Sequence, residues 1–349
     1  MRALAFLGAG KVGIIDKPIP EPGFGDAVIR TTASLICTSD VHTVAGTIAI
    51  PEGRVLGHES VGVVHAVGAG VTGFRPGDRV AVNAVTPCGH CNPCQRGHAS
   101  QCGGMLGGYK FTAQKDGNLA EYFHVNDADF NLVSIPDDLS DEQALYATDM
   151  LSTGFVGVEQ ADIPLGGSVA IFAQGPVGLS ATIGAKLRGA GLIIAIESRP
   201  ERAALARSYG ADVVLDPRRD DLVAEIIALT GDGVDAAIDA LGSQQTFEAC
   251  VKATRPGGVI SNIGYHGDGY SSLSIPLPEF GLGMGNKTIR TALCPGGRER
   301  MERLFKLIGG GRFDPTRMTT HRFRFDDVVE GFQMMRDKRD NIIKPLVTY

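Results

Sequence analysis

The chain lacks the features that mark several large classes of protein. No apolar run in its 349 residues is long enough to span a bilayer, and Met1–Phe6 is too short for the apolar core of a signal peptide. Positive charge is in the minority, and the formal net charge of −6 argues against a nucleic-acid or anionic-membrane surface. Glycine is abundant but has no period, which excludes collagen. We therefore expect a soluble, cytoplasmic globular protein with no nucleic-acid or membrane partner.

The cysteines are odd in number and too unevenly spread for a secreted disulfide framework. There are seven, and four of them lie together in Cys88-Gly89-His90-Cys91-Asn92-Pro93-Cys94 and Cys102. Four thiolates with this spacing satisfy a tetrahedral zinc ion completely and leave no open position. The alternatives are four free thiols or two disulfides. We predict a structural zinc ion on a lobe at about residues 86–104, with the nearby histidines outside its ligand set.

The length allows two domains, and the residue patterns differ between them. Up to about residue 148 the chain predicts strands and turns. From Asp149 onward, strand and helix signals alternate, which is typical of an α/β parallel sheet. The expected elements of this second part begin with strand Ser168–Phe172, helix Val177–Arg188 and strand Leu192–Ile196. A last strand, Ile342–Tyr349, is placed to return to the first domain.

Two glycine-rich segments compete as dinucleotide-binding turns. Residues 8–13, GAGKVG, match G-x-G-x-x-G, but a proline-rich run follows where a helix is required, so we predict a hairpin there. Residues 173–178, AQGPVG, lack the first glycine but lie between a strand and a helix. There, Gly175, Pro176, Val177 and Gly178 are predicted to approach a pyrophosphate at the helix N-terminus.

An acidic residue supports the second segment. Glu197 ends the next strand, 19 residues after Gly178. A carboxylate at this point accepts hydrogen bonds from the adenosine ribose and repels a 2′-phosphate. The alternative is an ordinary strand–helix turn without a ligand. We predict nucleotide binding by this turn, with Ser198 and Arg199 beside the ribose.

A second metal site is expected around His58 and Glu59, in the sequence VLGHESVG. A single histidine at a loop–strand junction is more often structural than ligating. One cysteine and one aspartate can join it, namely Cys37 and Asp149. Cysteine, histidine and aspartate together leave an open fourth position, which is the arrangement of catalytic zinc.

The sequence resembles the zinc-containing medium-chain dehydrogenases/reductases over nearly its whole length. Within this family it is most similar to bacterial secondary-alcohol dehydrogenases that act on short ketones and propan-2-ol. The resemblance rests on four segments: Cys37–His42 (CTSDVH), Gly57–Glu59 (GHE), Thr148–Phe155 (TDMLSTGF) and Leu293–Arg298 (LCPGGR). Asp149 is the most specific residue, since many family members have a second cysteine there.

The resemblance implies a GroES-like β domain interrupted by a Rossmann domain, with the active site in the cleft between them. The domains would be residues 1–148 and 149–292, with 293–349 returning to the first. It also implies a homotetramer and a catalytic zinc held by Cys37, His58 and Asp149, with Glu59 as an alternative or transient ligand. The zinc would act as a Lewis acid on the alcohol or ketone oxygen while hydride passes to or from the nicotinamide.

Further roles follow from the same resemblance and from sequence proximity. Ser39 would take the substrate proton and pass it to His42, whose ordinary pKa lies near neutrality. A turn-capping serine and an exposed loop histidine are the alternatives. Thr153 would line the nicotinamide site, or be only a first-turn helix residue. Tyr109 replaces a larger aromatic residue of the thermophilic members and would widen the substrate pocket.

Two departures from the thermophilic members affect the cofactor prediction. Those members use NADP, carry Gly-Ser-Arg where this chain has Glu197-Ser198-Arg199, and have an aromatic residue at Pro217. They have also lost the structural-zinc cysteines that this chain keeps. We therefore predict NAD rather than NADP, because Glu197 opposes a 2′-phosphate. The predicted function is an NAD-dependent secondary-alcohol dehydrogenase. The alternatives are NADP(H), a polyol, amino alcohol or aldehyde adduct as substrate, and a non-enzymatic nucleotide sensor.

Overall fold

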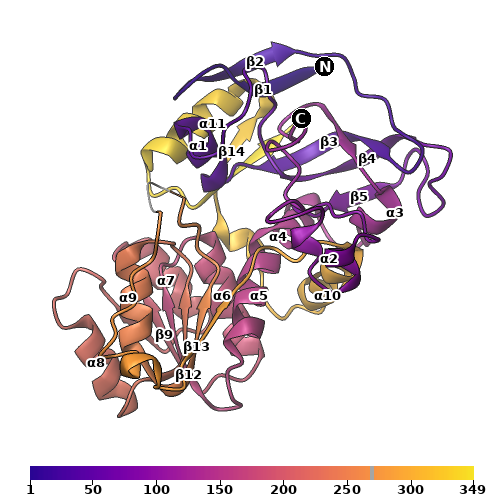
Figure 1. Ribbon diagram of the computed structural model, residues 1–349. Coiled ribbons are helices and arrows are strands. Elements are labelled where there is room, and N and C mark those ends of the chain that lie inside the picture. The colour runs from indigo at the N-terminus through magenta and orange to yellow at the C-terminus, as the bar shows by residue number, and fades with distance from the viewer. Residues whose placement is uncertain (268–270) are drawn as a thin grey trace. The chain divides into compact units, whose positions relative to one another are not determined.

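The computed structural model describes residues 1–267 and 271–349, which form two compact units. Unit 1 consists of Met1–Ser152 together with Cys294–Tyr349, and unit 2 of Thr153–Leu293. Figure 1 shows both, with the C-terminal segment in yellow beside the indigo N-terminal elements. Both divisions fall slightly later in the chain than the borders that the sequence predicts.

Unit 1 opens with a β-hairpin made of β1 (Arg2–Phe6) and β2 (Val12–Asp16), which pair antiparallel. The connecting turn contains Gly8 and Gly10, whose φ angles of 105° and 72° favour glycine. The first glycine-rich segment is therefore a hairpin turn without a following helix, as predicted.

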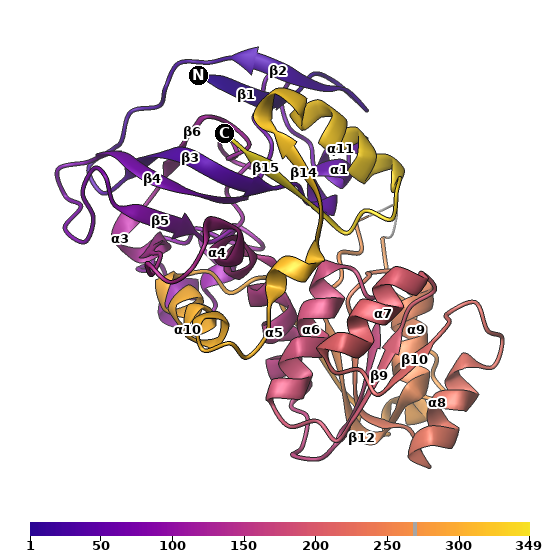
Figure 2. The same ribbon diagram turned by 180° about the vertical axis from the view of Figure 1, so that it is seen from behind.

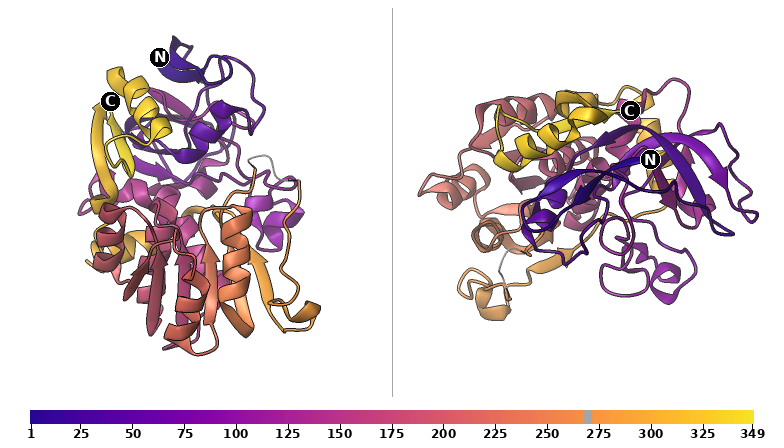
Figure 3. Two further views of the ribbon diagram at one scale, coloured as in Figure 1. Left: turned by 90° about the vertical axis from the view of Figure 1, so that its left-hand side faces the viewer. Right: turned by 90° about the horizontal axis from the view of Figure 1, so that it is seen from above.

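A seven-stranded sheet forms the centre of unit 1, in the order β14-β15-β3-β4-β5-β7, with β6 also paired to β3. Leu35 of β3 lies opposite Glu59 of β4, so the chain just after β3 and just before β4 meets at one end of the sheet. The C-terminal strand β15 pairs with β3, which confirms the predicted return. Figure 2 labels β15 near β14 and β3, and Figure 3 shows the yellow C-terminal segment in the same unit as the indigo N-terminal elements. The strands are β3 (Ala27–Leu35), β4 (Glu59–Val67), β5 (Arg79–Val82), β6 (Tyr122–Val125), β7 (Leu132–Ser134), β14 (Thr319–Arg324) and β15 (Lys344–Thr348).

Unit 1 has more helix than the sequence analysis expected. Helix α1 escaped notice because its N-cap is a cysteine, although Asp40 at the third position completes a capping box. The helices of unit 1 are α1 (Thr38–Ala45), α2 (Asn92–Gln95), α3 (Ala128–Asn131), α4 (Asp141–Thr148), α10 (Arg298–Gly309) and α11 (Val328–Asp337). No helix in the described ranges combines the length and apolar composition needed to cross a membrane.

Unit 2 is built on a six-stranded parallel sheet with the order β10-β9-β8-β11-β12-β13. Strand β9 is an uninterrupted apolar run, and β8 is apolar after Ser168, as expected for strands covered on both faces. The strand order reverses beside β8. Right-handed crossovers therefore place α6 and α7 on one face and α8 and α9 on the other, as Figures 1 and 2 show. This is the predicted Rossmann-type sheet.

The bounds of unit 2 agree closely with the predicted elements. Side chains from β8, β9 and β11 pack with those of α8 and α9 in one apolar cluster, including Phe172, Ile194, Ile226 and Phe247. The elements are α5 (Met150–Ala161, which begins in unit 1), β8 (Ser168–Phe172), α6 (Pro176–Leu187), β9 (Leu192–Ile196), α7 (Pro200–Tyr209), β10 (Val213–Leu215), α8 (Leu222–Thr230), β11 (Val234–Asp239), α9 (Gln244–Ala253), β12 (Thr254–Asn262) and β13 (Thr288–Thr291).

Candidate functional site

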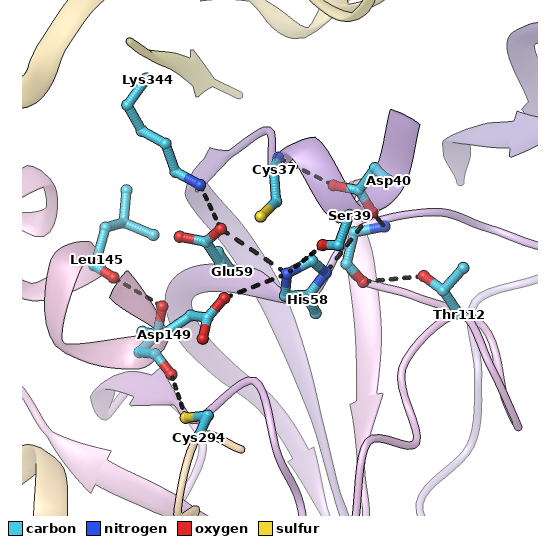
Figure 4. Close-up of polar contacts among 12 residues, drawn as sticks. Cys37, Ser39, Asp40, His58, Glu59, Thr112, Leu145, Asp149, Cys294 and Lys344 are labelled. Atoms are coloured by element: carbon cyan, nitrogen blue, oxygen red, sulfur yellow. Dashed lines mark hydrogen bonds and ion pairs between the residues drawn. The ribbon is translucent and has the colours of Figure 1, made fainter. Parts of the chain in front are cut away.

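The structure brings the four predicted catalytic-zinc ligands together. One donor atom from each of Cys37, His58, Glu59 and Asp149 lies within 4.8 Å of the others. The cysteine precedes α1, His58 and Glu59 stand at the start of β4, and the aspartate separates α4 from α5 (Figure 4). His58 Nε2 is 3.4 Å from an Asp149 carboxylate oxygen and 3.8 Å from one of Glu59. Residues 112 apart in sequence thus form one cluster inside unit 1.

Asp40 joins the two loops that carry Cys37 and His58. Its Oδ2 accepts a hydrogen bond from the backbone N–H of Cys37, and its Oδ1 accepts one from Gly57, each at 3.0 Å. Gly57 has a φ of 93°, and a Cβ there would stand 2.5 Å from the side chain of Leu119. Only glycine fits this turn, which explains the residue that precedes the histidine.

His58 is almost fully buried, at 2 % exposure, and both ring nitrogens face polar groups. Its Nδ1 is 3.2 Å from the hydroxyl of Tyr109 and 3.6 Å from Asp40 Oδ1, which leaves Nε2 to face the other donors. Burial alone would lower the pKa of His58. The surrounding oxygens of Tyr109, Asp40 and Asp149 outweigh burial and raise this pKa well above its usual value. The cluster therefore stabilises positive charge at its centre.

Two residues that the sequence analysis did not predict as partners of the metal ligands are in contact with them. Tyr109, expected only to shape the pocket, has its hydroxyl on His58. Lys344, which was not singled out, lies on β15 with its Nζ 2.5 Å from Glu59 Oε1. The sequence signal was a lysine inside an otherwise apolar run, IIKPLV, at residues 342–347.

The donor set fits a zinc ion. Thiolate, imidazole and carboxylate are the groups that zinc takes in catalytic sites, and donor atoms less than 4.8 Å apart are compatible with bonds of about 2.0–2.3 Å to one centre. Glu59 Oε2 is buried without a hydrogen-bond partner among the described residues, as expected of an oxygen facing a cation. Three protein ligands would leave a position for a substrate oxygen.

The predicted proton-relay residues both lie on α1. Ser39 Oγ is 3.3 Å from His58 Nε2, so its hydroxyl reaches the donor cluster. His42 follows one helical turn later, on the same side of the helix. Thr153 is a buried residue of α5. The roles of all three stay predictions.

The second cluster consists of the four neighbouring cysteines. The sulfurs of Cys88, Cys91, Cys94 and Cys102 lie within 4.8 Å of one another on a lobe that contains α2. All seven cysteines of the described chain are free thiols, so the disulfide alternative is not seen. The ring of His90 turns to the backbone oxygen of Cys88, away from the sulfurs.

The thiols of this lobe are polarised for metal binding. Backbone N–H groups of Cys88 and Cys91 point to the sulfurs of Cys102 and Cys88, at 3.2 and 3.3 Å. The backbone N–H of Cys94 is the main cause that lowers the pKa of Cys91 to about 6. A thiolate is therefore available near neutral pH, and zinc binds thiolates.

The second glycine-rich segment has the geometry of a dinucleotide-binding turn. It connects β8 to α6, with Gly175 as N-cap and Pro176 at the first helical position. A Cβ on Gly175 would meet only a side-chain nitrogen of Arg202 at 4.0 Å, whereas one on Gly178 would stand 1.8 Å from the Ala173 oxygen. Gly175 thus leaves room for a ligand and Gly178 allows close packing, as the fingerprint requires.

The missing first glycine of this fingerprint is replaced at a conformational cost. Ala173 stands at that place with a φ of 71°, a region that alanine rarely adopts. Glu197 fixes the turn from the next strand. Its carboxylate accepts hydrogen bonds from the backbone N–H groups of Gln174, Ser198 and Arg199, at 2.8 to 3.1 Å. The acid predicted for the ribose is therefore held rigidly at the end of β9.

Comparisons with known proteins identify the family of this chain. A family described as zinc-binding dehydrogenase matches residues 176–309, and one described as alcohol dehydrogenase GroES-like domain matches residues 23–137. The NADP-dependent isopropanol dehydrogenase of Thermoanaerobacter brockii is 48 % identical over 99 % of both chains. An alcohol dehydrogenase of Cupriavidus necator is 45 % identical over 99 % of this chain and 97 % of the relative.

A solved structure shows the same fold over the full length. The alcohol dehydrogenase TADH from Thermus sp. ATN1 has a TM-score of 0.91 and 32 % identity, covering 100 % of this chain and 99 % of that one. The chain belongs to the zinc-containing alcohol dehydrogenases of the medium-chain dehydrogenase/reductase family. It is an oxidoreductase with a GroES-like and a Rossmann domain, and its predicted resemblance to secondary-alcohol dehydrogenases is confirmed.

Proposed function

We propose that this enzyme interconverts short secondary alcohols, such as propan-2-ol, and their ketones, with a nicotinamide dinucleotide as hydride carrier. The observation that carries the proposal is the convergence of Cys37, His58 and Asp149 within 4.8 Å, with donors suited to zinc and room for a substrate oxygen. The isopropanol dehydrogenase of T. brockii, to which the chain is 48 % identical, supports the substrate class.

The protein's own residues would divide the work as follows. When bound, zinc supplies Lewis-acid polarisation of the substrate oxygen, and the nicotinamide supplies the acceptor or donor of hydride. Asp40 and Tyr109 hold His58 with Nε2 toward the donor cluster. Ser39, 3.3 Å from that nitrogen, takes the hydroxyl proton and passes it to His42.

We propose NAD as the preferred cofactor on one residue of this chain, although the comparisons favour NADP. The T. brockii relative is NADP-dependent by name. Glu197, however, presents a carboxylate at the end of β9, held by three backbone N–H groups, where a 2′-phosphate would meet like charge. Arg199 is adjacent and would attract that phosphate, so the balance of the two side chains decides the preference.

Initial rates test substrate and cofactor together. Propan-2-ol oxidation and acetone reduction are measured with NAD(H) and with NADP(H), for the wild type and Glu197→Gly. We expect faster turnover with NAD(H), and a shift of the kcat/KM ratio toward NADP(H) by about 10- to 100-fold in the variant, for about 1.4–3 kcal/mol of relieved repulsion.

A matched variant controls for charge alone. Glu248→Gln on α9 removes a carboxylate from the same unit without touching β9, and should leave the cofactor ratio unchanged. Wild-type preference for NADP(H) would mean that Arg199 outweighs Glu197. No turnover with either cofactor would favour a polyol, an amino alcohol or an aldehyde adduct as substrate. If these also failed to react, a non-enzymatic nucleotide sensor would be favoured.

We further propose a homotetramer, supported by unit 2. Its sheet ends in the edge strand β13, and the preceding segment exposes Leu277, Leu282 and Met284 at 57 %, 68 % and 79 %. Exposed apolar clusters of this kind mark protein–protein interfaces. Light scattering coupled to size exclusion should give four times the chain mass of 36.7 kDa, and a monomeric mass would overturn the proposal.

A further inference from the structure

A buried aspartate shapes the loop that follows β11 in unit 2. Asp239 is the last residue of this strand, and its side chain has no exposed surface. Its Oδ1 accepts hydrogen bonds from the backbone N–H groups of Leu241 and Gly242, at 3.0 Å each. Burial raises the pKa of the Asp239 carboxyl. A buried carboxylate is costly when one oxygen lacks a partner, so the neighbour of the second oxygen matters for the whole loop.

His266 is the neighbour of that second oxygen. Its Nε2 lies 3.5 Å from Asp239 Oδ2, for which no hydrogen-bond partner is found among the described residues. The same nitrogen donates a hydrogen bond to Oδ1 of Asn262, the last residue of β12, at 2.9 Å. The Asn262 amide in turn donates to the backbone oxygen of Gly264 at 3.2 Å. One imidazole therefore connects the ends of two neighbouring strands.

The loops after β11 and β12 also touch through their backbones. Gly242 has a φ of 89°, and a Cβ there would stand 2.4 Å from the backbone oxygen of Tyr265. A Cβ on Gly264 would stand 2.2 Å from the backbone nitrogen of Gly242. The ring of Phe247 on α9 meets the His266 ring at 90°, with centroids 6.1 Å apart. The His266 side chain, at 14 % exposure, is thus packed between the two loops and α9.

The loop after β11 borders the glycine-rich turn at the point where the strand order reverses. The backbone N–H of Ala240 donates to the Phe172 oxygen at 3.1 Å, and a Cβ on Gly178 would stand 3.6 Å from Ala240 Cβ. Ligands of such sheets bind outside the carboxyl ends of the strands at this reversal, and each half of the sheet takes one half of a dinucleotide. Gly175 and Glu197 stand on the half made of β8, β9 and β10. The loops after β11 and β12 therefore belong to the nicotinamide half.

We infer that His266 is a positioning residue for the dinucleotide: it fixes the loop after β11 beside the glycine-rich turn and so sets the affinity for the nicotinamide half. The inference rests on the proposed nicotinamide-dinucleotide function. A purely structural role of His266 would lower stability, or weaken the binding of both halves of the ligand alike. Positioning predicts that only ligands with a nicotinamide half bind more weakly when the imidazole is removed.

Binding of NADH and of AMP separates the two halves. Titration calorimetry on the full-length protein measures both dissociation constants. In His266→Ala we expect the Kd of NADH to rise about 10-fold and that of AMP to change by less than about twofold, because a buried hydrogen-bonded contact is lost at the nicotinamide half only. With saturating propan-2-ol, the KM for NAD should rise by a similar factor, while kcat should fall by less than about threefold.

Two matched variants identify the cause. His266→Gln keeps an N–H donor at about the reach of Nε2 and should recover most of the NADH affinity. Arg255→Gln removes the partner of Asp235, which lies near the opposite end of β11 with its Oδ1 2.9 Å from Arg255 Nε. That edge of the sheet is remote from the carboxyl ends of the strands, so neither Kd should change. If His266→Ala does not fold, His266→Asn, whose amide is too short to reach Asp239, is judged by the same criteria.

The outcomes distinguish the role of His266 from the proposed function. Wild-type protein that binds neither NADH nor NADPH would overturn the dinucleotide function and the role of His266 with it. If the wild type binds NADPH more tightly than NADH, NADPH and 2′,5′-ADP take the place of NADH and AMP in the same comparison. Unchanged NADH affinity in His266→Ala, an equal loss of NADH and AMP binding, or no recovery in His266→Gln would overturn the role of His266 and leave the cofactor site standing.

Discussion

The two donor clusters of unit 1 differ in almost every respect. The lobe cluster takes four identical thiols from residues 88–102, and the pKa of one of them is lowered. The other cluster takes a thiol, an imidazole and two carboxylates from residues 37–149, backed by a buried lysine. Four thiolates close the shell of a zinc ion, whereas three mixed protein ligands leave one position open. The comparison teaches that a zinc site whose four positions are all filled by protein ligands serves stability, whereas a site with one position left open can serve reactivity.

The largest effect is expected from breaking the mixed cluster. Cys37→Ser should lower kcat by about 1,000-fold or more, because the polarisation of the substrate oxygen is lost. The unfolding midpoint should change by less than about 3 °C, since serine nearly matches the size of the buried cysteine side chain. Steady-state rates and calorimetry measure the two effects. Retained activity would contradict the assignment of Cys37 as a ligand of the catalytic zinc.

Ser39 tests whether proton transfer belongs to the same cluster. Ser39→Ala should lower kcat by about 100-fold with zinc content unchanged, because the hydroxyl beside His58 is removed. Ser39→Thr keeps a hydroxyl and should recover most of the rate. Equal rates for Ser39→Ala and the wild type would leave the serine as an N-terminal helix residue only.

The lobe should respond in the opposite way. Cys91→Ser is expected to lower the unfolding midpoint by about 5–10 °C, because a structural zinc contributes directly to folding free energy. The rate per folded molecule should stay within about threefold of the wild type. A variant with normal stability and lost activity would reverse the roles of the two clusters.

The smallest effect concerns the thiols themselves. In metal-free protein the pKa of Cys91 is lowered to about 6, mainly by the backbone N–H of Cys94, while burial raises that of Cys94 to about 12. At pH 7 a group with a pKa near 6 is mostly thiolate, so iodoacetamide should label Cys91 first. Peptide mass spectrometry measures the order, which should be lost at pH 5. Faster labelling of Cys94 would contradict the geometry.

The sequence predicted those parts of the molecule whose cause is local. Strands Ser168–Phe172 and Leu192–Ile196 have the predicted bounds, since apolar runs flanked by turns need no distant information. The hairpin at residues 8–13 was distinguished from the strand–helix turn at residues 173–178 because no helix follows it. The four-cysteine cluster was readable from spacing alone.

The rest depends on contacts that spacing does not encode. Cys37, His58 and Asp149 were assembled from a hypothesis of ligand types and from resemblance. The antiparallel register of Leu35 with Glu59 explains why the first two meet. Lys344 lies 285 residues from Glu59, and alternation along a strand would place a lysine in solvent. Helix α1 was missed because cysteine is an unusual N-cap and Asp40 acts through its side chain.

The most direct test of the central claim is the zinc content of native protein, measured by mass spectrometry under non-denaturing conditions. We predict two zinc ions per wild-type chain and one in a folded, inactive Cys37→Ser variant, with the remaining ion in the four-cysteine lobe. A single zinc ion in the wild type that is retained by Cys37→Ser would contradict the assignment of a second, catalytic site.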